Sequence, residues 1–534
     1  MTPPARPRHA GGAALVASGI LLSRIFGLVR SRLIGHFLGT SGAADALTAA
    51  IRIPNVLQNL FGEGVLSASF IPVYARLRAA GDHEEAGRVA GAVGALLALT
   101  SAVLVLAGIV LTPYAIPFIA GGFTGEKRDL TVLLVQVMFP GVGLLVMSAW
   151  SLGILNSHGR FFLSYASPVA MNVVMIATLL WQGPALASAP AGQPRLALYL
   201  AVASVVGSAA QFLVQLPAVW RLDRQMRFDL AARNPNVLAV LATFVPVFIG
   251  RGVVQVSAYA DGLIASFVSD GAVALLGYAQ VIAILPVSLF GMSVSAAALP
   301  AMSGERGNDD EVSSAVRRRL DDGLHRIAFY VVPSAMAFFA FGDVVGGLLF
   351  QTGHFSPVET RWLWAVLAGS GVGLLAGTLG RLYASTWYAL RDTRTPLRFA
   401  MLRVMLTVAL GLLASLRLPR ALGVDPRWGV AGLTASAGVA AWVEFLLLRR
   451  SLDRRIGAGG VSRRYLLTLW AAASAAALPV WVVKWYGGPG HPVVVGLAGL
   501  TLYGAAYFAV TARAGIPEAE SFWGRVGRLT GRRA

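Results

Sequence analysis

The chain of 534 residues contains no cysteine, which excludes disulfide bonds and thiolate metal sites. It has almost no lysine either: Lys127 and Lys484 are the only two, and the other basic side chains are arginines or histidines. Charged residues make up only 13% of the chain, against roughly 25% in soluble domains. A chain with so few charges lacks the polar side chains that a water-facing surface requires.

Enzyme signatures are also missing from the sequence. It has no phosphate-binding loop, no paired-histidine metal motif and no nucleophile elbow. We therefore expect a transporter and not an enzyme, with no cofactor, no catalytic residue and no bound metal. Without a phosphate-binding loop, energy for transport would come from an ion gradient, the membrane potential or the substrate gradient.

Apolar residues dominate what is present. They make up 56% of the chain, and the mean hydropathy is +0.68. Since a helix needs about 20 apolar residues to cross a bilayer, we predict an all-α polytopic membrane protein with about fourteen transmembrane helices. The predicted spans are 11–37, 45–75, 88–111, 130–155, 161–182, 195–220, 236–268, 272–301, 322–346, 360–389, 396–416, 428–448, 464–484 and 492–512. Several exceed the length of a straight crossing, which indicates tilted or kinked helices.

The basic residues indicate an orientation. The net charge is +19, but the arginines fall in short segments between apolar runs, so we expect contact with membrane lipids and no nucleic acid. One set of loops holds roughly three times as many basic residues as the other. The positive-inside rule then places both termini in the cytoplasm. The first apolar run continues to Arg24 without a cleavage site, so we interpret it as a retained helix.

A short motif occurs twice and predicts the domain organisation. Leu60-Phe61-Gly62 reappears as Leu289-Phe290-Gly291, and the six spans between them give both copies the same orientation. Parallel repeats are typical of transporters that bind substrate between two halves, although chance matching in a leucine-rich chain is the alternative. We predict two pseudo-symmetric six-helix lobes, residues 1–225 and 226–450, followed by residues 451–534 with helices 13 and 14 and a basic cytoplasmic tail.

Charged side chains at bilayer depth are the candidates for a binding site. Each costs a few kcal/mol, so they usually face a wet cavity or pair with one another. Helices 1 and 2 are rich in them, and Arg381 of helix 10 is a further one that we place in a cavity. The predicted substrate-binding residues are Arg24, Arg30, Asp45, Arg52, Asn55, Glu63 and, from helix 7, Arg251.

For the two acids in this set, a structural role is the alternative to a role in substrate binding. Asp45 lies near the predicted outer interface, where a stabilising role is favoured over a functional one. Glu63 has Met292 as its counterpart in the repeat, so the packing motif itself requires no acid there. Glu63 is thus predicted to pair with an arginine of helix 1 or to accept a proton, and a simple ion pair joining helices 1 and 2 is the alternative.

Helix 2 also contains residues that weaken a helix. Pro54 cannot donate a backbone hydrogen bond, so the helix can bend there. Gly62 and Gly64 add two flexible positions close to Glu63. We predict a hinge at Pro54, Gly62 and Gly64, although such residues also occur in membrane helices that do not move.

Four stretches resemble one family. Residues 23–39 read SRIFGLVRSRLIGHFLG, and residues 43–77 read AADALTAAIRIPNVLQNLFGEGVLSASFIPVYARL. Together with ILNSHGRFFLSYASPVAMNV at 154–173 and LYASTWYALRDTRTPLR at 382–398, they resemble the MurJ (MviN) family of lipid II flippases. This family belongs to the exporter superfamily that includes the MATE transporters. The resemblance covers nearly the whole chain.

The resemblance implies a function and roles for residues. It implies two lobes around a central cavity and a groove for the lipid tail beside helices 13 and 14. The substrate would be lipid II, the undecaprenyl-diphosphate-linked peptidoglycan precursor, flipped to the outer leaflet of the bacterial inner membrane in cell wall synthesis. Arg24 and Arg30 match the family's helix 1 arginines, Asp45 and Glu63 match helix 2 acids, and Arg52 matches a helix 2 base. Arginines suit a diphosphate because they form bidentate, charge-assisted hydrogen bonds.

The chain departs from the family pattern at several positions. Ser31 stands where the family often has Asp, and Gln58 and Val281 stand where it usually has Arg. We hypothesise that Arg251 replaces one of the missing cations. Residues 396–416 contain neither Asp nor Asn, which the family's sodium site uses in helix 11, so sodium coupling is not expected.

Two other functions remain open from the sequence. The missing cations favour a flippase for another polyprenyl-linked glycan, and a non-transporting scaffold of the cell wall machinery is a third possibility. Our main hypothesis from the sequence is a monomer that flips lipid II through alternating access.

Overall fold

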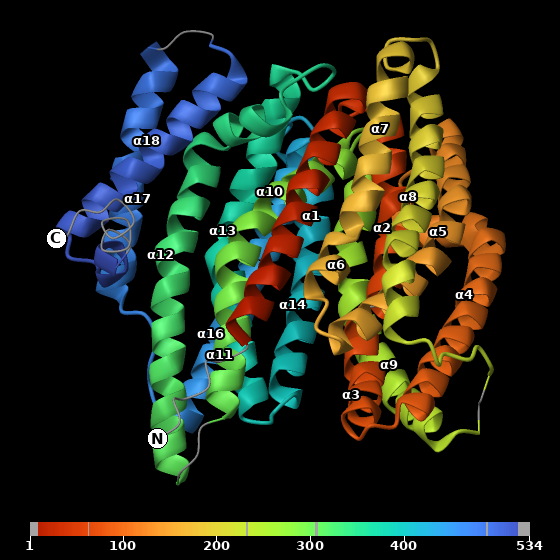
Figure 1. Ribbon diagram of the computed structural model, residues 1–534. Helices are drawn as coiled ribbons and strands as arrows, with labels where there is room; N and C mark the ends of the chain where they lie inside the picture. The colour runs from red at the N-terminus through yellow and green to blue at the C-terminus, as the bar shows by residue number, and fades with distance from the viewer. Residues whose placement is uncertain (1–8, 62, 231–232, 305–307, 487–489, 522–534) are drawn as a thin grey trace, which may run out of the picture. The chain divides into compact units, whose positions relative to one another are not determined.

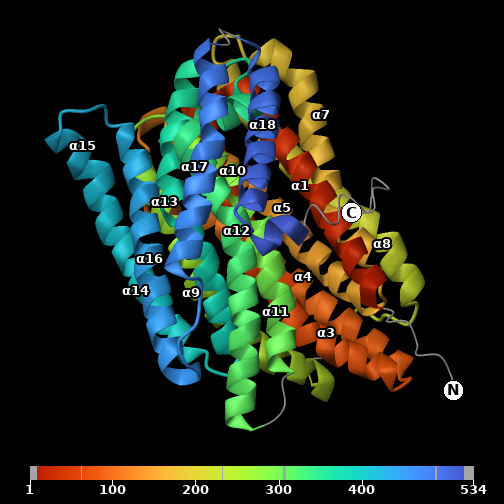
Figure 2. The ribbon, with the colours of Figure 1, turned by 90° about the vertical axis from the view of Figure 1, so that its left-hand side faces the viewer.

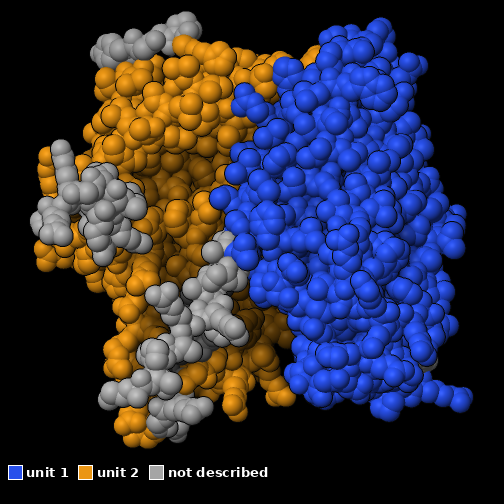
Figure 3. All heavy atoms as spheres, viewed as in Figure 1, with its two compact units in different colours: residues 1–274 blue, residues 275–534 orange. Residues whose placement is uncertain are grey.

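The structure is a computed structural model that describes residues 9–61, 63–230, 233–304, 308–486 and 490–521. Some helical side chains are also outside the description, among them those of residues 61–64 and 249–258. All regular elements in the described ranges are helices, as predicted (Figure 1). The chain divides into two compact units, residues 1–274 and 275–534 (Figure 3).

Unit 1 contains nine helices in the part that the structure describes, and α10 begins at its end. Their bounds are α1 His9–Leu38, α2 Gly42–Phe61, α3 Glu63–Ala79, α4 His83–Ala120, α5 Gly125–Ser157, α6 Phe161–Ala166, α7 Pro168–Leu186, α8 Gly192–Leu222 and α9 Pro235–Ser266.

Unit 2 takes in most of α10 and the helices that follow, two of which are short π-helices, η1 and η2. Their bounds are α10 Ala272–Pro286, η1 Val287–Met292, α11 Ser293–Ser303, α12 Asp309–Phe350, α13 Pro357–Ala389, α14 Arg394–Leu412, η2 Leu413–Arg417, α15 Leu418–Ala421, α16 Trp428–Ile456, α17 Arg463–Tyr486 and α18 Pro492–Arg513.

The polytopic membrane class is confirmed. Among the described residues, 11 helices are long and apolar enough to cross a membrane. The predicted spans that do not appear among them are 11–37, 45–75 and 236–268, which correspond to α1, to α2 with α3, and to α9. Of α9, the segment Pro235–Phe248 is found as a shorter apolar helix, and the side chains of residues 249–258 that follow it lie outside the described residues. The count of fourteen therefore stays a prediction.

The lobe boundaries also stay predictions. Helix α9, which the sequence assigns to the second lobe, packs against α3 and α4 within unit 1. The division by contacts therefore falls after residue 274, while the predicted boundary at 225 concerns the repeat in the sequence.

Small residues and one tryptophan hold unit 1 together. Helix α5 packs against α2, α4 and α8. Trp150 of α5 is fully buried, and its indole N–H donates to the carbonyl oxygen of Ala90 on α4 at 3.0 Å. A Cβ atom on Gly94 would lie 3.0 Å from the Trp150 ring, so the glycine makes room for the indole. The paired N–H removes the cost of burying a polar group.

In unit 2, helix α13 packs against α12 and α16. A Cβ on Gly373 would lie 2.3 Å from the Cα of Gly438, so these two glycines allow α13 and α16 to approach closely. Small residues at a helix contact are the usual means of packing in membranes, where burial of apolar surface gives little drive.

In unit 2, a tyrosine hydroxyl replaces the helical hydrogen-bond donor that a proline lacks. Pro333, inside α12, has no N–H to donate to the carbonyl oxygen of Phe329 four residues earlier. The hydroxyl of Tyr507 on α18 donates to that oxygen at 2.7 Å, and both groups are buried. Tyr503 donates similarly to the carbonyl oxygen of Pro333 at 2.8 Å. These bonds attach the α17–α18 hairpin to α12.

The second copy of the repeated motif lies in a distorted helical segment. In unit 2, the predicted span 272–301 contains the π-helix η1, which includes Leu289-Phe290-Gly291. A π-helix locally widens the turn and often marks a functional bend. In the first copy, Gly62 lies outside the described residues, between the end of α2 at Phe61 and the start of α3 at Glu63.

Candidate functional site

Arg30 on α1 is the clearest candidate in unit 1. Its Nη1 lies 3.7 Å from the sulfur of Met175 on α7, and its Nε is buried without a hydrogen-bond partner. No carboxylate pairs with it among the residues that the structure describes. A partly buried guanidinium whose Nε has access neither to water nor to a hydrogen-bond partner is costly, so this arrangement favours an incoming anion.

Arg24 lies on a different face of the same helix. The six-residue spacing rotates its position by about 240° relative to Arg30. Its side chain is exposed and makes no ion pair or hydrogen bond with another described residue. Arg24 thus offers a hydrated charge, whereas Arg30 offers a desolvated one.

Asp45, at the start of α2, is fully buried, and both of its carboxylate oxygens accept hydrogen bonds. Its Oδ1 accepts from the N–H of Ala274 at 2.8 Å, and its Oδ2 accepts from the N–H of Gly271 at 2.7 Å. The ammonium of Lys127 donates to Oδ2 at 2.5 Å. A carboxylate at the N-terminus of α10 satisfies its free N–H groups and interacts favourably with the helix dipole. The position of Asp45 indicates a structural role, and its predicted substrate contact stays a prediction.

Lys127 joins two acids in this network. It also donates to Oδ1 of Asp270, at 2.8 Å, and this hydrogen bond lowers the pKa of the Asp270 carboxyl. Its ammonium lies 4.2 Å from the centre of the Phe123 ring. The sequence treated Lys127 only as a basic residue of an outer loop. The scarcity of lysine is the sequence signal that could have singled out Lys127. The only other lysine of the sequence, Lys484, also pairs with an aspartate, Asp343.

Arg52 is packed against α9. A Cβ atom on Gly262 would lie 1.8 Å from the Nη1 of Arg52, so only glycine leaves room for the guanidinium. The charge of Asp261 acts on Arg52, and the hydroxyl of Tyr259 donates to the Arg52 carbonyl oxygen at 3.5 Å. Arg52 therefore links α2 to α9, and its predicted contact with substrate stays a prediction.

Pro54 and Asn55 occupy the middle of α2. Pro54 is buried, and its missing N–H leaves the carbonyl oxygen of Ala50 without its helical donor. Asn55 is exposed beside it. The predicted hinge residue Gly62 and the side chains of Gln58, Glu63, Gly64 and Arg251 lie outside the described residues.

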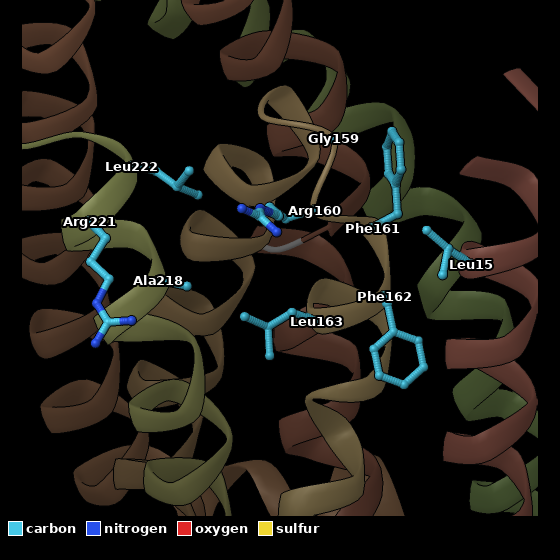
Figure 4. A pocket seen from close by; sticks show the side chains of 9 residues that line it. All are labelled: Leu15, Gly159, Arg160, Phe161, Phe162, Leu163, Ala218, Arg221 and Leu222. Atoms are coloured by element: carbon cyan, nitrogen blue, oxygen red, sulfur yellow. The ribbon is translucent and has the colours of Figure 1, made fainter. Parts of the chain in front are cut away.

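A pocket of about 460 Å³ lies elsewhere in unit 1, between the ends of α1, α6 and α8 (Figure 4). It is mostly apolar, with the guanidinium groups of Arg160 and Arg221 among its polar groups. None of the predicted site residues lines it. The residues that line it are Leu15, Gly159, Arg160, Phe161, Phe162, Leu163, Ala218, Arg221 and Leu222.

Comparison with known proteins assigns the family. A family model described as "Lipid II flippase MurJ" matches residues 34–493. The chain belongs to this family. The lipid II flippase MurJ of Burkholderia cenocepacia is 32% identical over 515 residues, which cover 93% of this chain and 96% of the relative. The probable lipid II flippase MurJ of Rhizobium meliloti is also 32% identical, over 93% of this chain and 92% of its own.

Solved structures agree on the MurJ fold. A lipid II flippase MurJ in an inward closed conformation matches with a TM-score of 0.77 at 20% identity, covering 93% of this chain and 98% of that one. An inward-facing MATE transporter of the MOP superfamily matches with a TM-score of 0.65 at 16% identity, covering 83% of this chain and 98% of its own. The resemblance seen in the sequence is confirmed, and the family is one of transporters.

Proposed function

We propose that this chain flips lipid II, an undecaprenyl-diphosphate-linked muropeptide, from the cytoplasmic to the outer leaflet by alternating access. The observation that carries the proposal is Arg30, a partly buried guanidinium whose Nε is unsatisfied and which has no carboxylate partner in the described part of the chain. Relatives at 32% identity over more than nine-tenths of this chain bear the name of the same activity.

The chemistry of Arg30 suits the diphosphate of such a substrate. A diphosphate oxygen accepts charge-assisted hydrogen bonds from a guanidinium, and the bond is stronger where water is excluded. When the anion binds, the cost of the unpaired charge is removed. Arg24 supplies a second positive charge on the same helix, and Asn55 supplies an exposed amide for the polar headgroup.

Helix α2 provides the flexible element of the proposed cycle. Pro54, which has no N–H to donate to the carbonyl oxygen of Ala50, weakens this helix near its middle. Bending there requires the loss of fewer backbone hydrogen bonds than bending a regular helix. Glu63, Gly62, Gly64 and Arg251 keep their predicted roles in this cycle.

Complementation and binding test the proposal together. A bacterium depleted of its own lipid II flippase should grow when it carries this chain, and should not grow with the Arg24→Ala, Arg30→Ala double variant. Arg88→Ala is the matched control, because it removes an exposed arginine that pairs only with Glu84 and Glu85 on α4. Failure of the unaltered chain to support growth would favour the scaffold function.

A flippase for another polyprenyl-linked glycan is the second candidate. It is favoured by Gln58 and Val281, which stand at positions where the family usually has arginine. Competition between lipid II and other polyprenyl diphosphates for the purified protein separates the two. Stronger binding of a different glycan would replace lipid II as the substrate.

We also propose a monomer in the bacterial cytoplasmic membrane with both termini in the cytoplasm. The support is the loop charge bias and the even number of predicted spans. A reporter active only in the cytoplasm, fused after Ala534, should be active. An active periplasmic reporter at that position would reverse the orientation.

A further inference from the structure

Unit 2 contains a cluster of charged side chains that the proposed site does not use. Nη1 of Arg403 on α14 donates to Oε2 of Glu444 on α16 at 3.0 Å. Arg381 on α13 lies close enough for the charges of both residues to act on it. Helix α16 lies beside both α13 and α14 (Figure 2), so three helices contribute one charge each.

The cluster lies well inside the helices that carry it. Arg381 is eight residues from the end of α13, which is about 12 Å along a helix axis. Arg403 is nine residues from the start of α14, or about 13 Å. Charges this far from a helix end usually border water or a ligand, because contact with lipid tails is costly.

The surface around Arg381 is unlike a lipid-facing surface. Gly377, Arg381 and Ser385 follow one another at four-residue spacing on α13, and none of them is buried. This stripe is small and polar. On α14, the exposed large apolar residues include Met401 and Met405, and Arg403 is rotated by about 200° from Met401. The cluster is thus separate from the apolar face of α14.

The charges in the cluster do not balance. Two arginines and one glutamate give a net charge of +1, and Glu444 is already bonded to Arg403. The guanidinium of Arg381 makes no hydrogen bond with any residue in the described ranges. An ion pair that only held helices together would need no third charge. The surplus matches a monoanion, which a guanidinium binds through two parallel hydrogen bonds when the anion is a carboxylate.

We propose that Arg381, supported by Arg403 and Glu444, binds a carboxylate of the peptide carried by the substrate headgroup. This inference rests on the proposed function, because it assigns a second contact for the same substrate. A diphosphate fits less well, since its larger charge exceeds the single surplus positive charge. Arg403 is a positioning residue that keeps Glu444 from neutralising Arg381.

Binding of three lipids to the purified full chain tests the proposal. The lipids are lipid II, the same lipid with its peptide carboxylates amidated, and the same lipid without its peptide. For the unaltered chain, lipid II should bind most tightly. Arg381→Gln should weaken lipid II binding about ten-fold and leave the other two dissociation constants unchanged, because it removes only the carboxylate contact.

Two further variants make the test specific. Arg403→Gln should weaken lipid II binding as Arg381→Gln does, because Glu444 would then pair with Arg381 and remove the surplus charge. Arg361→Gln is the matched control, since it replaces an exposed arginine at the other end of the same helix and should change nothing. Arg30→Ala should weaken the binding of all three lipids, because each of them carries the diphosphate.

The outcomes distinguish this inference from the proposed function. If Arg381→Gln weakens the binding of all three lipids equally, or of none of them, the proposed carboxylate contact is wrong. The proposal that the chain flips lipid II is unaffected by that result. If the unaltered chain binds none of the three lipids, both the proposed function and this inference are wrong. Thermal unfolding of Arg381→Gln in detergent must match that of the unaltered chain, and Arg361→Gln sets the tolerated difference.

Discussion

Units 1 and 2 treat their intramembrane polar groups differently. In unit 1, Arg30 has no carboxylate partner among the described residues, and no side chain there donates to the Ala50 carbonyl that Pro54 leaves free. In unit 2, Arg403 is paired with Glu444, and Tyr507 fills the gap that Pro333 creates. The same two features, a cation within an apolar helix and a helix proline, have partners in unit 2, whereas the described side chains of unit 1 supply neither partner.

This difference suggests a division of labour. Groups left unsatisfied cost stability but are available to a ligand or to a conformational change, whereas satisfied groups hold a framework rigid. Each unit has one exception. Asp45 of unit 1 is fully bonded at the start of α10, and Arg381 of unit 2 carries a surplus charge. The following variants test the comparison, beginning with the largest expected effect.

Asp45→Ala should be the most destabilising change. It leaves the ammonium of Lys127 and two N–H groups near the start of α10 without their buried acceptor. Breaking a buried ion pair in this way costs about 3–5 kcal/mol. Chemical unfolding in detergent measures the loss. Asp129→Ala, which removes an exposed acid 3.7 Å from Arg128, is the control and should be close to neutral.

Arg30→Met and Arg403→Met should change stability in opposite directions. Arg30→Met removes a partly buried charge that has no carboxylate partner among the described residues, so the free energy of unfolding should stay equal or rise. Arg403→Met removes the charge-assisted hydrogen bond to the Glu444 carboxylate, and should cost about 1–3 kcal/mol. Parallel unfolding curves provide the comparison. A similar loss of stability in both variants would mean that Arg30 has a structural partner.

Tyr507→Phe should cost about 1–3 kcal/mol, because the buried Phe329 carbonyl loses its donor. In a Pro333→Ala background the helix regains its own N–H at that position, so the same substitution should cost much less. The double-mutant cycle measures this coupling. Equal costs in both backgrounds would show that the tyrosine does not compensate for the proline.

The smallest predicted effect is a pH dependence. The pKa of Asp270 is lowered by its hydrogen bond with Lys127, so its contribution is present above the unfolded pKa and is lost as the pH falls through the lower folded pKa. Stability should decline in acid, below about pH 4. Asp270→Asn should flatten this slope slightly, because the side chain is largely exposed and salt screens the pair. An unchanged slope would contradict the role of this pair.

The elements predicted from the sequence were those encoded locally. Apolar run length predicted the membrane helices, and the hinge predicted from the proline and glycines of helix 2 stays a prediction. Arg30 stood out because a charge within an apolar run is costly wherever its partner lies. Motifs of consecutive residues also predicted the family.

The long-range pairs could not be predicted in the same way. Asp45 and Lys127 are 82 residues apart, and Arg403 and Glu444 are 41 apart, so their contacts depend on how the helices pack. The space that Gly262 leaves for Arg52 is equally invisible in a linear pattern. For this reason the sequence placed Asp45 and Arg52 together with Arg30, although the structure engages them with α10 and α9.

Flipping of lipid II by the purified protein in proteoliposomes is the most direct measurement of the central claim, that Arg30 binds the substrate's diphosphate. The unaltered chain should move lipid II across the bilayer, and Arg30→Met should remain as stable while its lipid II dissociation constant rises about ten- to hundred-fold and flipping is lost. Normal flipping and binding by a correctly folded Arg30→Met variant would contradict the account.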